Sequence, residues 1–306
     1  MMPKKVMNVL KRQKYKIVGN HSATKLCLWT RKSIRTGGKE HCYKERFYSD
    51  IGIKSHRCLQ CTPAVMWCSL RCRFCWRATE LTLGQKIPKE DEPEKLVDEF
   101  IEAQRQLLTG LGGVPHDKKY LKEAQNPSNV AISLSGDPCC YSHLSDLIKE
   151  FHKRDMKTFV VTNGTFPEAL ESLETLPTQL YVSMSSFNKE MMDKVNAPLI
   201  KDAWERYIKT LRLFPSLKTR RVIRLTMVKE LNMIKPEEYA NLIEIASPDF
   251  IECKAFMSVG FSRKRLPYSM MPSHEEIKDF SQKIADFTDY KVVDEKKESR
   301  VVLLKK

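Results

Sequence analysis

Residues 130–164 read VAISLSGDPCCYSHLSDLIKEFHKRDMKTFVVTNG, and this stretch decides the fold class. It opens with an apolar run at 130–134, continues with apolar residues at helical spacing over 142–153 and closes with a second apolar run at 158–161. Two short apolar runs joined by a helix are typical of a βαβ unit, whose strands run parallel with a right-handed crossover. The stretch therefore predicts an α/β fold built on a parallel sheet.

The same alternation continues before and after this unit. We expect strands at 64–67, 130–134, 158–161, 180–183, 222–227 and 250–253, and helices at 94–108, 142–153, 167–173, 200–214, 236–246 and 273–287. Six such units are too few for a closed eight-stranded barrel, so we expect a partial (β/α)6 barrel, with a doubly wound sheet as the alternative. In both folds the functional residues lie at the carboxyl ends of the strands.

The limits of this alternation set the expected domains. Residues 1–63 lack it and form a basic, cysteine-rich N-terminal extension, 64–290 form the partial barrel, and 291–306 form a short C-terminal β segment. The first 39 residues hold eleven Lys or Arg and no acidic residue, in a chain whose net charge is +15. Such a segment is attracted to polyanions, which predicts a nucleic-acid partner.

The composition also indicates where the protein works. No run approaches the roughly 18 apolar residues of a membrane helix, and the N-terminus lacks the apolar core of a secretory signal. Ten cysteines in a chain without an export signal stay reduced and available to metals or to chemistry. We expect a cytoplasmic protein with no membrane association whose cysteines carry its function.

A cysteine loop directly follows the first expected strand. It reads Cys68-Ser-Leu-Arg-Cys72-Arg-Phe-Cys75, a C-x3-C-x2-C spacing. Three thiolates on one loop can hold three corners of a 4Fe–4S cluster and leave the fourth iron open to a substrate. The alternative is a zinc ribbon made by Cys72 and Cys75 with Cys58 and Cys61, in which Cys68 would be spare.

This loop resembles the signature of the radical S-adenosylmethionine (SAM) superfamily, with Phe74 as its aromatic residue. The resemblance implies that SAM chelates the fourth iron and is cleaved to a deoxyadenosyl radical, and it implies a partial barrel. Further SAM-binding residues are expected at the strand ends, where Ser-Gly-Asp-Pro resembles the superfamily's Gly-Glu-Pro-like element with a shorter acid. These candidates are Gly136, Asp137, Pro138, Asn163, Ser183 and Arg224.

Almost the whole chain resembles the archaeal tRNA 4-demethylwyosine synthase family. The features that carry this resemblance are the basic extension, the second set of cysteines Cys27, Cys42 and Cys58, and the stretch Cys42-Tyr43-Lys44. It implies a second, auxiliary 4Fe–4S cluster on that set, although Cys61 leaves the third ligand ambiguous. It also implies that 1-methylguanosine at tRNA position 37 gains two carbons of pyruvate to form 4-demethylwyosine, with pyruvate bound as a Schiff base to Lys44, or failing that to Lys254.

The resemblance and the charge together define the expected partners. These are tRNA, with tRNA-Phe as the expected substrate, pyruvate, and an external electron donor. An external donor is expected because no flavodoxin-like domain precedes the cysteines. The chain is expected to be a monomer. The expected phosphate contacts are Lys4, Lys5, Lys11, Arg12, Arg31, Lys32, Arg35, Arg263, Lys264 and Arg265. Three alternatives stay open: another radical SAM RNA-modifying enzyme, a non-catalytic zinc-binding RNA module, and a two-cluster electron carrier.

Overall fold

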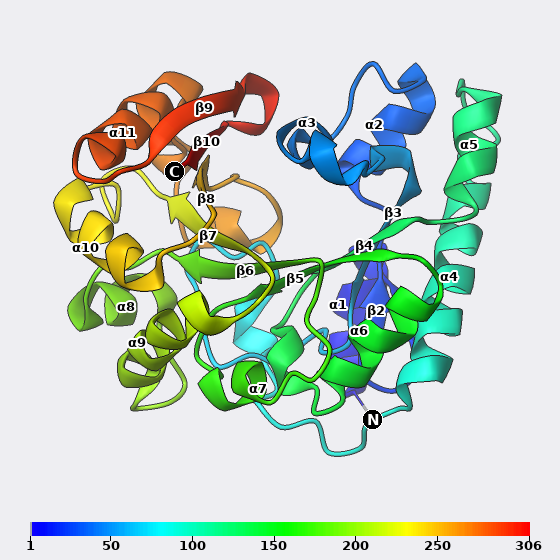
Figure 1. Cartoon of the computed structure of the whole chain (residues 1–306). Coiled ribbons are helices and arrows are strands. Elements are labelled where there is room, and N and C mark those ends of the chain that lie inside the picture. Colours follow the sequence, from blue (N-terminus) through cyan, green and yellow to red (C-terminus); the bar gives the residue numbers. More distant parts are fainter. Residues whose placement is uncertain (1) are drawn as a thin grey trace. The chain divides into compact units, whose positions relative to one another are not determined.

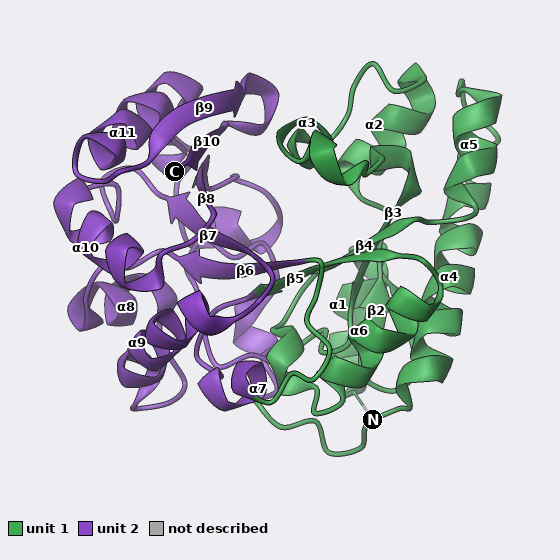
Figure 2. Ribbon diagram, viewed as in Figure 1, with its two compact units in different colours: residues 1–67, 85–161, 172–178 green, residues 68–84, 162–171, 179–306 purple. Residues whose placement is uncertain are grey.

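The computed structural model describes residues 2–306 and forms two compact units (Figures 1 and 2). Of the described residues, unit 1 comprises 2–67, 85–161 and 172–178, and unit 2 comprises 68–84, 162–171 and 179–306. Neither unit is a continuous stretch of the sequence. No helix of residues 2–306 combines the length and the apolar character that crossing a bilayer requires.

Unit 1 is an α/β unit whose sheet begins antiparallel and becomes parallel. Strand β2 pairs antiparallel with β1 and β3, and β3, β4 and β5 then run parallel in chain order. Helices α4 and α6 pack against each other, and α4 also contacts β1, β2 and β3 (Figure 1). The elements are α1 (Lys4–Arg12), β1 (Lys16–Val18), β2 (Ser22–Thr24), α2 (Leu28–Thr36), α3 (Tyr43–Phe47), β3 (Cys58–Thr62), α4 (Pro93–Thr109), α5 (Lys118–Ala124), β4 (Asn129–Ile132), α6 (Leu144–Lys153) and β5 (Lys157–Thr162).

The first parallel strand lies earlier in the sequence than expected. It is β3, whereas the expected strand at 64–67 is a buried turn closed by a hydrogen bond from the Trp67 N–H to the Ala64 carbonyl, 3.1 Å long. A short apolar run marks burial but does not by itself distinguish a strand from a buried turn. The expected strand was therefore wrong, and the proposed boundary at residue 63 falls directly after β3.

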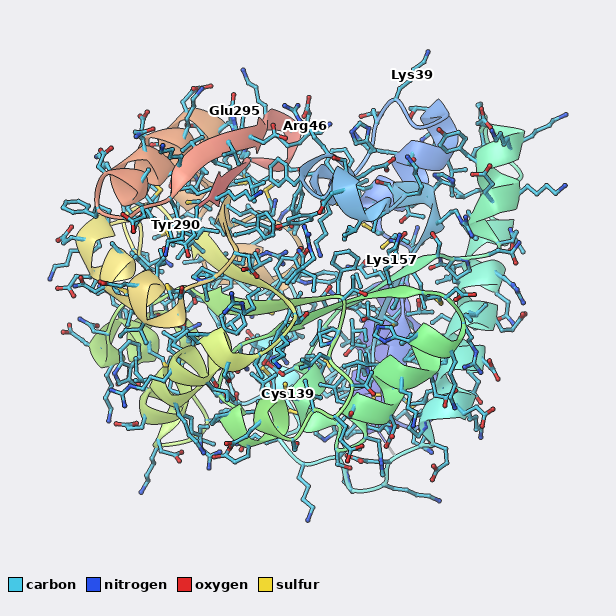
Figure 3. The ribbon with its side chains drawn as sticks, viewed as in Figure 1. Lys39, Arg46, Cys139, Lys157, Tyr290 and Glu295 are labelled. Carbon is cyan, nitrogen blue, oxygen red and sulfur yellow. The ribbon has the colours of Figure 1, made fainter. Side chains whose placement is uncertain are left out.

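Unit 2 continues with parallel strands and closes with an antiparallel pair. Strands β6, β7 and β8 are parallel, and β10 lies between β8 and β9, antiparallel to both. The Tyr290 hydroxyl donates to the Pro248 carbonyl and ties the start of β9 to the start of β8 (Figure 3). The elements are α7 (Pro167–Glu171), β6 (Gln179–Met184), α8 (Lys189–Asn196), α9 (Ala203–Leu213), β7 (Arg220–Met227), α10 (Pro236–Ala246), β8 (Phe250–Ala255), α11 (His274–Asp286), β9 (Lys291–Lys296) and β10 (Val301–Lys305).

All six expected helices are confirmed, and strands β9 and β10 lie within residues 291–306, where a short β segment was expected. Helices α4, α6, α7, α9, α10 and α11 lie where the apolar spacing placed them. The start of α11 has a capping box, since the Ser273 hydroxyl accepts from the Glu276 N–H and the Glu276 carboxylate accepts from the Ser273 N–H. Helix α8 was not expected, and its last residue, Asn196, proves to be part of the candidate site.

Candidate functional site

The backbone of the cysteine loop 68–75 is held by the end of α8 in unit 2. The N–H of Arg71 donates to the Asn196 carbonyl, and the N–H of Arg73 donates to the Val195 carbonyl, each at 2.9 Å. The last carbonyls of a helix have no partner within the helix, so they are available to a neighbouring segment. The loop is thereby fixed without contributing a helix or strand of its own.

Two asparagine amides point at sulfurs of this loop. The Asn196 Nδ2 lies 3.1 Å from the Cys72 Sγ, and its Oδ1 accepts from Ser186 Oγ at 2.6 Å, which orients the amide. The Asn163 Nδ2 lies 3.5 Å from the Cys68 Sγ. Hydrogen bonds to ligand sulfurs favour their negative charge and tune a bound cluster. Asn163 was expected to lie near SAM, whereas no sequence signal marked Asn196.

A buried arginine, Arg77, lies near the sulfurs of Cys68, Cys72 and Cys75. The Arg77 side chain is buried and donates to the Leu70 carbonyl at 2.9 Å. Burial by itself would lower its pKa, but the sulfurs of Cys68, Cys75 and Cys72 outweigh burial and raise the pKa above its ordinary value. Burial, followed by the effects of Cys68 and Cys75, raises the pKa of Cys72 to about 12. The sulfurs of the three cysteines therefore lie near one another and near Arg77.

The Arg265 side chain hydrogen-bonds to the backbone of this loop. Its Nε donates to the Arg73 carbonyl at 3.1 Å, and its Nη2 donates to the carbonyls of Cys75 and Arg77. Its Nη1 lies 2.7 Å from a carboxylate oxygen of Glu80. The guanidinium is thus committed to the loop, which disfavours its expected role as a phosphate contact.

The two remaining SAM candidates of unit 2 lie in one row across its parallel strands. Ser183 on β6 pairs in register with Arg224 on β7, which pairs in register with Glu252 on β8. The Arg224 Nε lies 2.8 Å from a carboxylate oxygen of Glu252, which is fully buried, and the guanidinium lies 4.4 Å from the centre of the Tyr181 ring. Arg224 therefore already pairs with a carboxylate, and a SAM carboxylate would have to share this arginine with Glu252.

The Gly-Asp-Pro element lies in unit 1 and supports the turn that precedes Cys68. Gly136 has φ +71, and a Cβ there would lie 1.7 Å from the Ala64 carbonyl oxygen. The Asp137 N–H donates to the Trp67 carbonyl at 2.8 Å, and its carboxylate accepts from the Cys139 N–H at 2.9 Å. These contacts give Gly136 and Asp137 a structural role, beside which SAM binding by Gly136, Asp137 and Pro138 stays a prediction.

The second set of cysteines comes together in unit 1. Cys27 and Cys42 directly precede helices α2 and α3, and Cys58 begins β3. Burial raises the pKa of Cys58, the Cys27 and Cys42 sulfurs raise it further, and the Lys44 amine lowers it. Three segments far apart in the sequence thus bring three thiols and one amine to a single place.

Cys61 is separated from this set by the geometry of β3. Side chains alternate between the two faces of a strand, so Cys58 and Cys61, three positions apart, point to opposite faces. Cys61 is fully buried, and its pKa is raised by burial and then by Cys58. The geometry therefore groups Cys58 with Cys27 and Cys42 and leaves Cys61 in the core.

The two candidate pyruvate lysines have different surroundings. Lys44 is half-buried on α3, and its Nζ lies 4.8 Å from the centre of the Phe159 ring on β5. Lys254 on β8 donates to the Ser299 carbonyl within unit 2. Arg46, two residues after Lys44 on α3, is exposed (Figure 3). Of the two lysines, Lys44 is the one placed beside a set of cysteines.

Each three-cysteine set suits a cluster better than a single ion. In residues 2–306 no group of three or more His, Cys, Asp and Glu side chains has a geometry suited to one metal ion. A zinc ribbon would need Cys58 and Cys61 on the same ion, about 3.8 Å apart, and they lie on opposite faces of β3. A 4Fe–4S cluster spreads its thiolates over separate irons, so three converging thiolates per set fit it.

Comparison with known families and relatives agrees with this site. The family described as Radical SAM superfamily matches residues 63–243, and the family described as Wyosine base formation matches residues 245–306. The chain is 50% identical to the S-adenosyl-L-methionine-dependent tRNA 4-demethylwyosine synthase of Pyrococcus abyssi, over 99% of this chain and 89% of the relative. It is 38% identical to the enzyme of that name from Methanocaldococcus jannaschii, over 99% of this chain and 96% of the relative.

Solved structures show the same similarity over the whole fold. A structure described as TYW1 with a lysine-pyruvate adduct bound superposes with a TM-score of 0.90 at 37% sequence identity, over 100% of this chain and 96% of that chain. A crystal structure of archaeal TYW1 superposes with a TM-score of 0.81 at 35% identity, over the same shares of the two chains.

Proposed function

The chain belongs to the S-adenosyl-L-methionine-dependent tRNA 4-demethylwyosine synthases of the radical SAM superfamily, and from this premise we propose the substrates and the residues of its reaction. The family fixes the coarse description: the protein has the expected radical SAM α/β fold, depends on SAM and a 4Fe–4S cluster, and acts on tRNA. The proposed reaction joins 1-methylguanosine at position 37 of tRNA-Phe to two carbons of pyruvate. We further propose that a cytoplasmic monomer works with an external electron donor.

Two cysteine sets carry the proposed cofactors. Cys68, Cys72 and Cys75 hold the SAM-binding cluster, and the set Cys27, Cys42 and Cys58 holds an auxiliary cluster. When bound, the first cluster supplies the electron that cleaves SAM and so starts the radical reaction. Asn163, Ser183 and Arg224 are the proposed SAM contacts of unit 2, and Gly136, Asp137 and Pro138 are those of unit 1.

One observation carries the proposed role of pyruvate: the Lys44 amine lies close enough to Cys58 to offset part of the rise in the pKa of that thiol that burial causes. The amine attacks the ketone carbon of pyruvate, water leaves, and an imine holds the acid beside the second cysteine set. A related structure is described as containing a lysine-pyruvate adduct, which supports a lysine in this role. Lys254 donates its amine to the Ser299 carbonyl and is not among the groups that act on Cys58, which makes it the less suitable lysine.

The proposed tRNA contacts include a basic pocket of unit 1. An open pocket of about 300 Å³ is lined by Lys14, Lys25 and Arg31, together with Leu26, Leu107, Gly110 and Leu111. Burial, followed by repulsion from Lys14, lowers the pKa of Lys25. The lining contains no acidic residue, so a phosphate in this pocket would relieve the repulsion between the cations.

Trapping with labelled pyruvate tests the role of Lys44. The anaerobically reconstituted enzyme is treated with labelled pyruvate and borohydride, and peptides are analysed by mass spectrometry. We expect one label per chain on the peptide containing Lys44. Lys44→Ala should form no 4-demethylwyosine from 1-methylguanosine tRNA while still cleaving SAM with dithionite, because SAM cleavage depends on the other cysteine set.

Lys54→Ala is the matched control, because Lys54 lies in the same extension but pairs at 3.5 Å with Glu45. It should keep both the label and the product. Label on Lys254 would move the role to that residue, and full product from Lys44→Ala would overturn Schiff-base chemistry at Lys44. Zinc as the only bound metal would overturn the assignment of both cysteine sets.

A further inference from the structure

Arg77 is a buried cation without a carboxylate partner. Its side chain donates to the Thr82 hydroxyl at 2.8 Å and to the Leu70 carbonyl at 2.9 Å, and the residue is 3% exposed. Within residues 2–306, no Asp or Glu oxygen lies within the 4.0 Å ion-pair distance of its guanidinium. These two acceptors are neutral, and the guanidinium also has a side-chain hydrogen bond to the Cys75 sulfur.

A buried guanidinium stays charged and is costly to bury unless a negative charge lies nearby. The neighbours that can become negative are the sulfurs of Cys68, Cys72 and Cys75, which all act on Arg77 electrostatically. Arg221 in the same unit shows the ordinary solution, since its Nη2 lies 2.9 Å from an Asp249 carboxylate oxygen. Arg77 therefore depends on the cysteine loop for its countercharge.

We propose that Arg77 is a positioning residue that supplies a fixed internal positive charge to the cluster held by Cys68, Cys72 and Cys75, and thereby makes that cluster easier to reduce. The inference rests on the proposed assignment of this cysteine set. It adds a role in setting the reduction potential to a residue that is not among the proposed SAM contacts or iron ligands.

The charges of the reaction step explain the direction of the effect. An oxidised 4Fe–4S core of charge 2+ with three thiolates carries a net charge of about −1, and one added electron brings it to about −2. Dithionite supplies that electron and is itself oxidised; no bond to the protein forms or breaks, and no proton is needed. A guanidinium against the sulfurs stabilises the more negative state, whereas the neutral Asn196 amide contributes only a dipole.

The experiment measures the reduction potential of the reconstituted enzyme by anaerobic EPR-monitored titration. The signal that changes on addition of SAM identifies the SAM-binding cluster. At a fixed potential, Arg77→Met should lower the ratio of reduced to oxidised cluster about tenfold, which is about 59 mV for a one-electron couple. Arg77→Lys keeps the charge and should recover most of the difference, and Arg221→Met should leave the potential unchanged.

Three outcomes would overturn the proposal. The first is an unchanged reduction potential in Arg77→Met at full iron and sulfide content. The second is a fall in reduction potential that is equally large in Arg77→Lys and Arg77→Met. The third is a fall in reduction potential in Arg221→Met as large as that in Arg77→Met. If Arg77→Met does not retain the cluster, Arg77→Gln replaces it and must titrate below Arg77→Lys. The readout needs neither tRNA nor pyruvate, so it is independent of the role of Lys44.

Discussion

Replacing Gly136 by alanine should be the most damaging single methyl addition in unit 1. The new Cβ would lie 1.7 Å from the Ala64 carbonyl oxygen and 2.6 Å from the Trp67 carbonyl oxygen, both backbone atoms that cannot rotate away. The positive φ of +71 adds roughly 1–2 kcal/mol for a residue with a Cβ. Relieving the overlap costs about 1–3 kcal/mol more as overpacking, and losing the Asp137–Trp67 hydrogen bond costs about 1 kcal/mol.

Gly52→Ala is the matched control for this change. Gly52 has a φ of +64, and a Cβ there would meet only the end of the Lys157 side chain, at 3.6 Å. It should therefore lose about 1–2 kcal/mol of unfolding free energy, whereas Gly136→Ala should lose about 3–6 kcal/mol. Urea unfolding measures both values, and the difference corresponds to a further fall in Tm of several degrees.

The same variant tests what the turn does for the site. Because the turn at 64–67 runs directly into Cys68, Gly136→Ala should also reduce the iron bound by the cysteine loop after reconstitution, and Gly52→Ala should not. Equal stability losses in the two variants would refute the steric argument. A normal cluster content with SAM binding lost in Gly136→Ala would show instead that this glycine acts on SAM directly.

Three further predictions concern the cysteines, the basic pocket and the half-buried His152. Cys58→Ala should lose about one of two 4Fe–4S clusters by iron and sulfide analysis while Cys61→Ala keeps both, and the opposite result would exchange their roles. Neutralising Lys14 and Lys25 to Gln together should flatten the slope of log tRNA affinity against log salt by about 1–2, and an unchanged slope would exclude the pocket. Burial lowers the pKa of His152 from its ordinary 6.5, so the folded state binds fewer protons there than the unfolded state, and the unfolding free energy falls as pH drops below about 6.5. His152→Gln should make the unfolding free energy fall less steeply when unfolding is measured from pH 7 to pH 5. An unaltered pH profile would contradict the lowered pKa of His152.

Local patterns were sufficient for most of the secondary structure. The apolar spacing of α4, α6 and α10 and the runs of β6, β7 and β8 lie where the sequence placed them, because each pattern depends on neighbours within one element. The strand at 64–67 failed because its apolar residues are buried in a turn rather than in a ladder. The true strand, β3, is harder to see, since its segment CLQCT is short and partly polar.

Placing the first parallel strand at 64–67 instead of 58–62 also affected the assignment of the second cysteine set. With no strand at 58–62, Cys58 and Cys61 appeared equivalent, and the third auxiliary ligand stayed ambiguous. Once β3 is in place, the alternation of its side chains puts the two thiols on opposite faces and groups one of them with Cys27 and Cys42. A correct strand assignment would have favoured Cys58 over Cys61 as the proposed third ligand from the sequence.

The sequence by itself determined the class of chemistry, because the spacing of Cys68, Cys72 and Cys75 lies on one loop and needs no distant residue to be read. Only the tertiary structure decided what surrounds those sulfurs. The Asn196 amide lies 124 positions from Cys72 in the chain, and Arg265 lies 190 positions from the Cys75 carbonyl to which it donates. Contacts of that kind follow from how helices and strands pack rather than from any local pattern, so they became visible only in the folded chain.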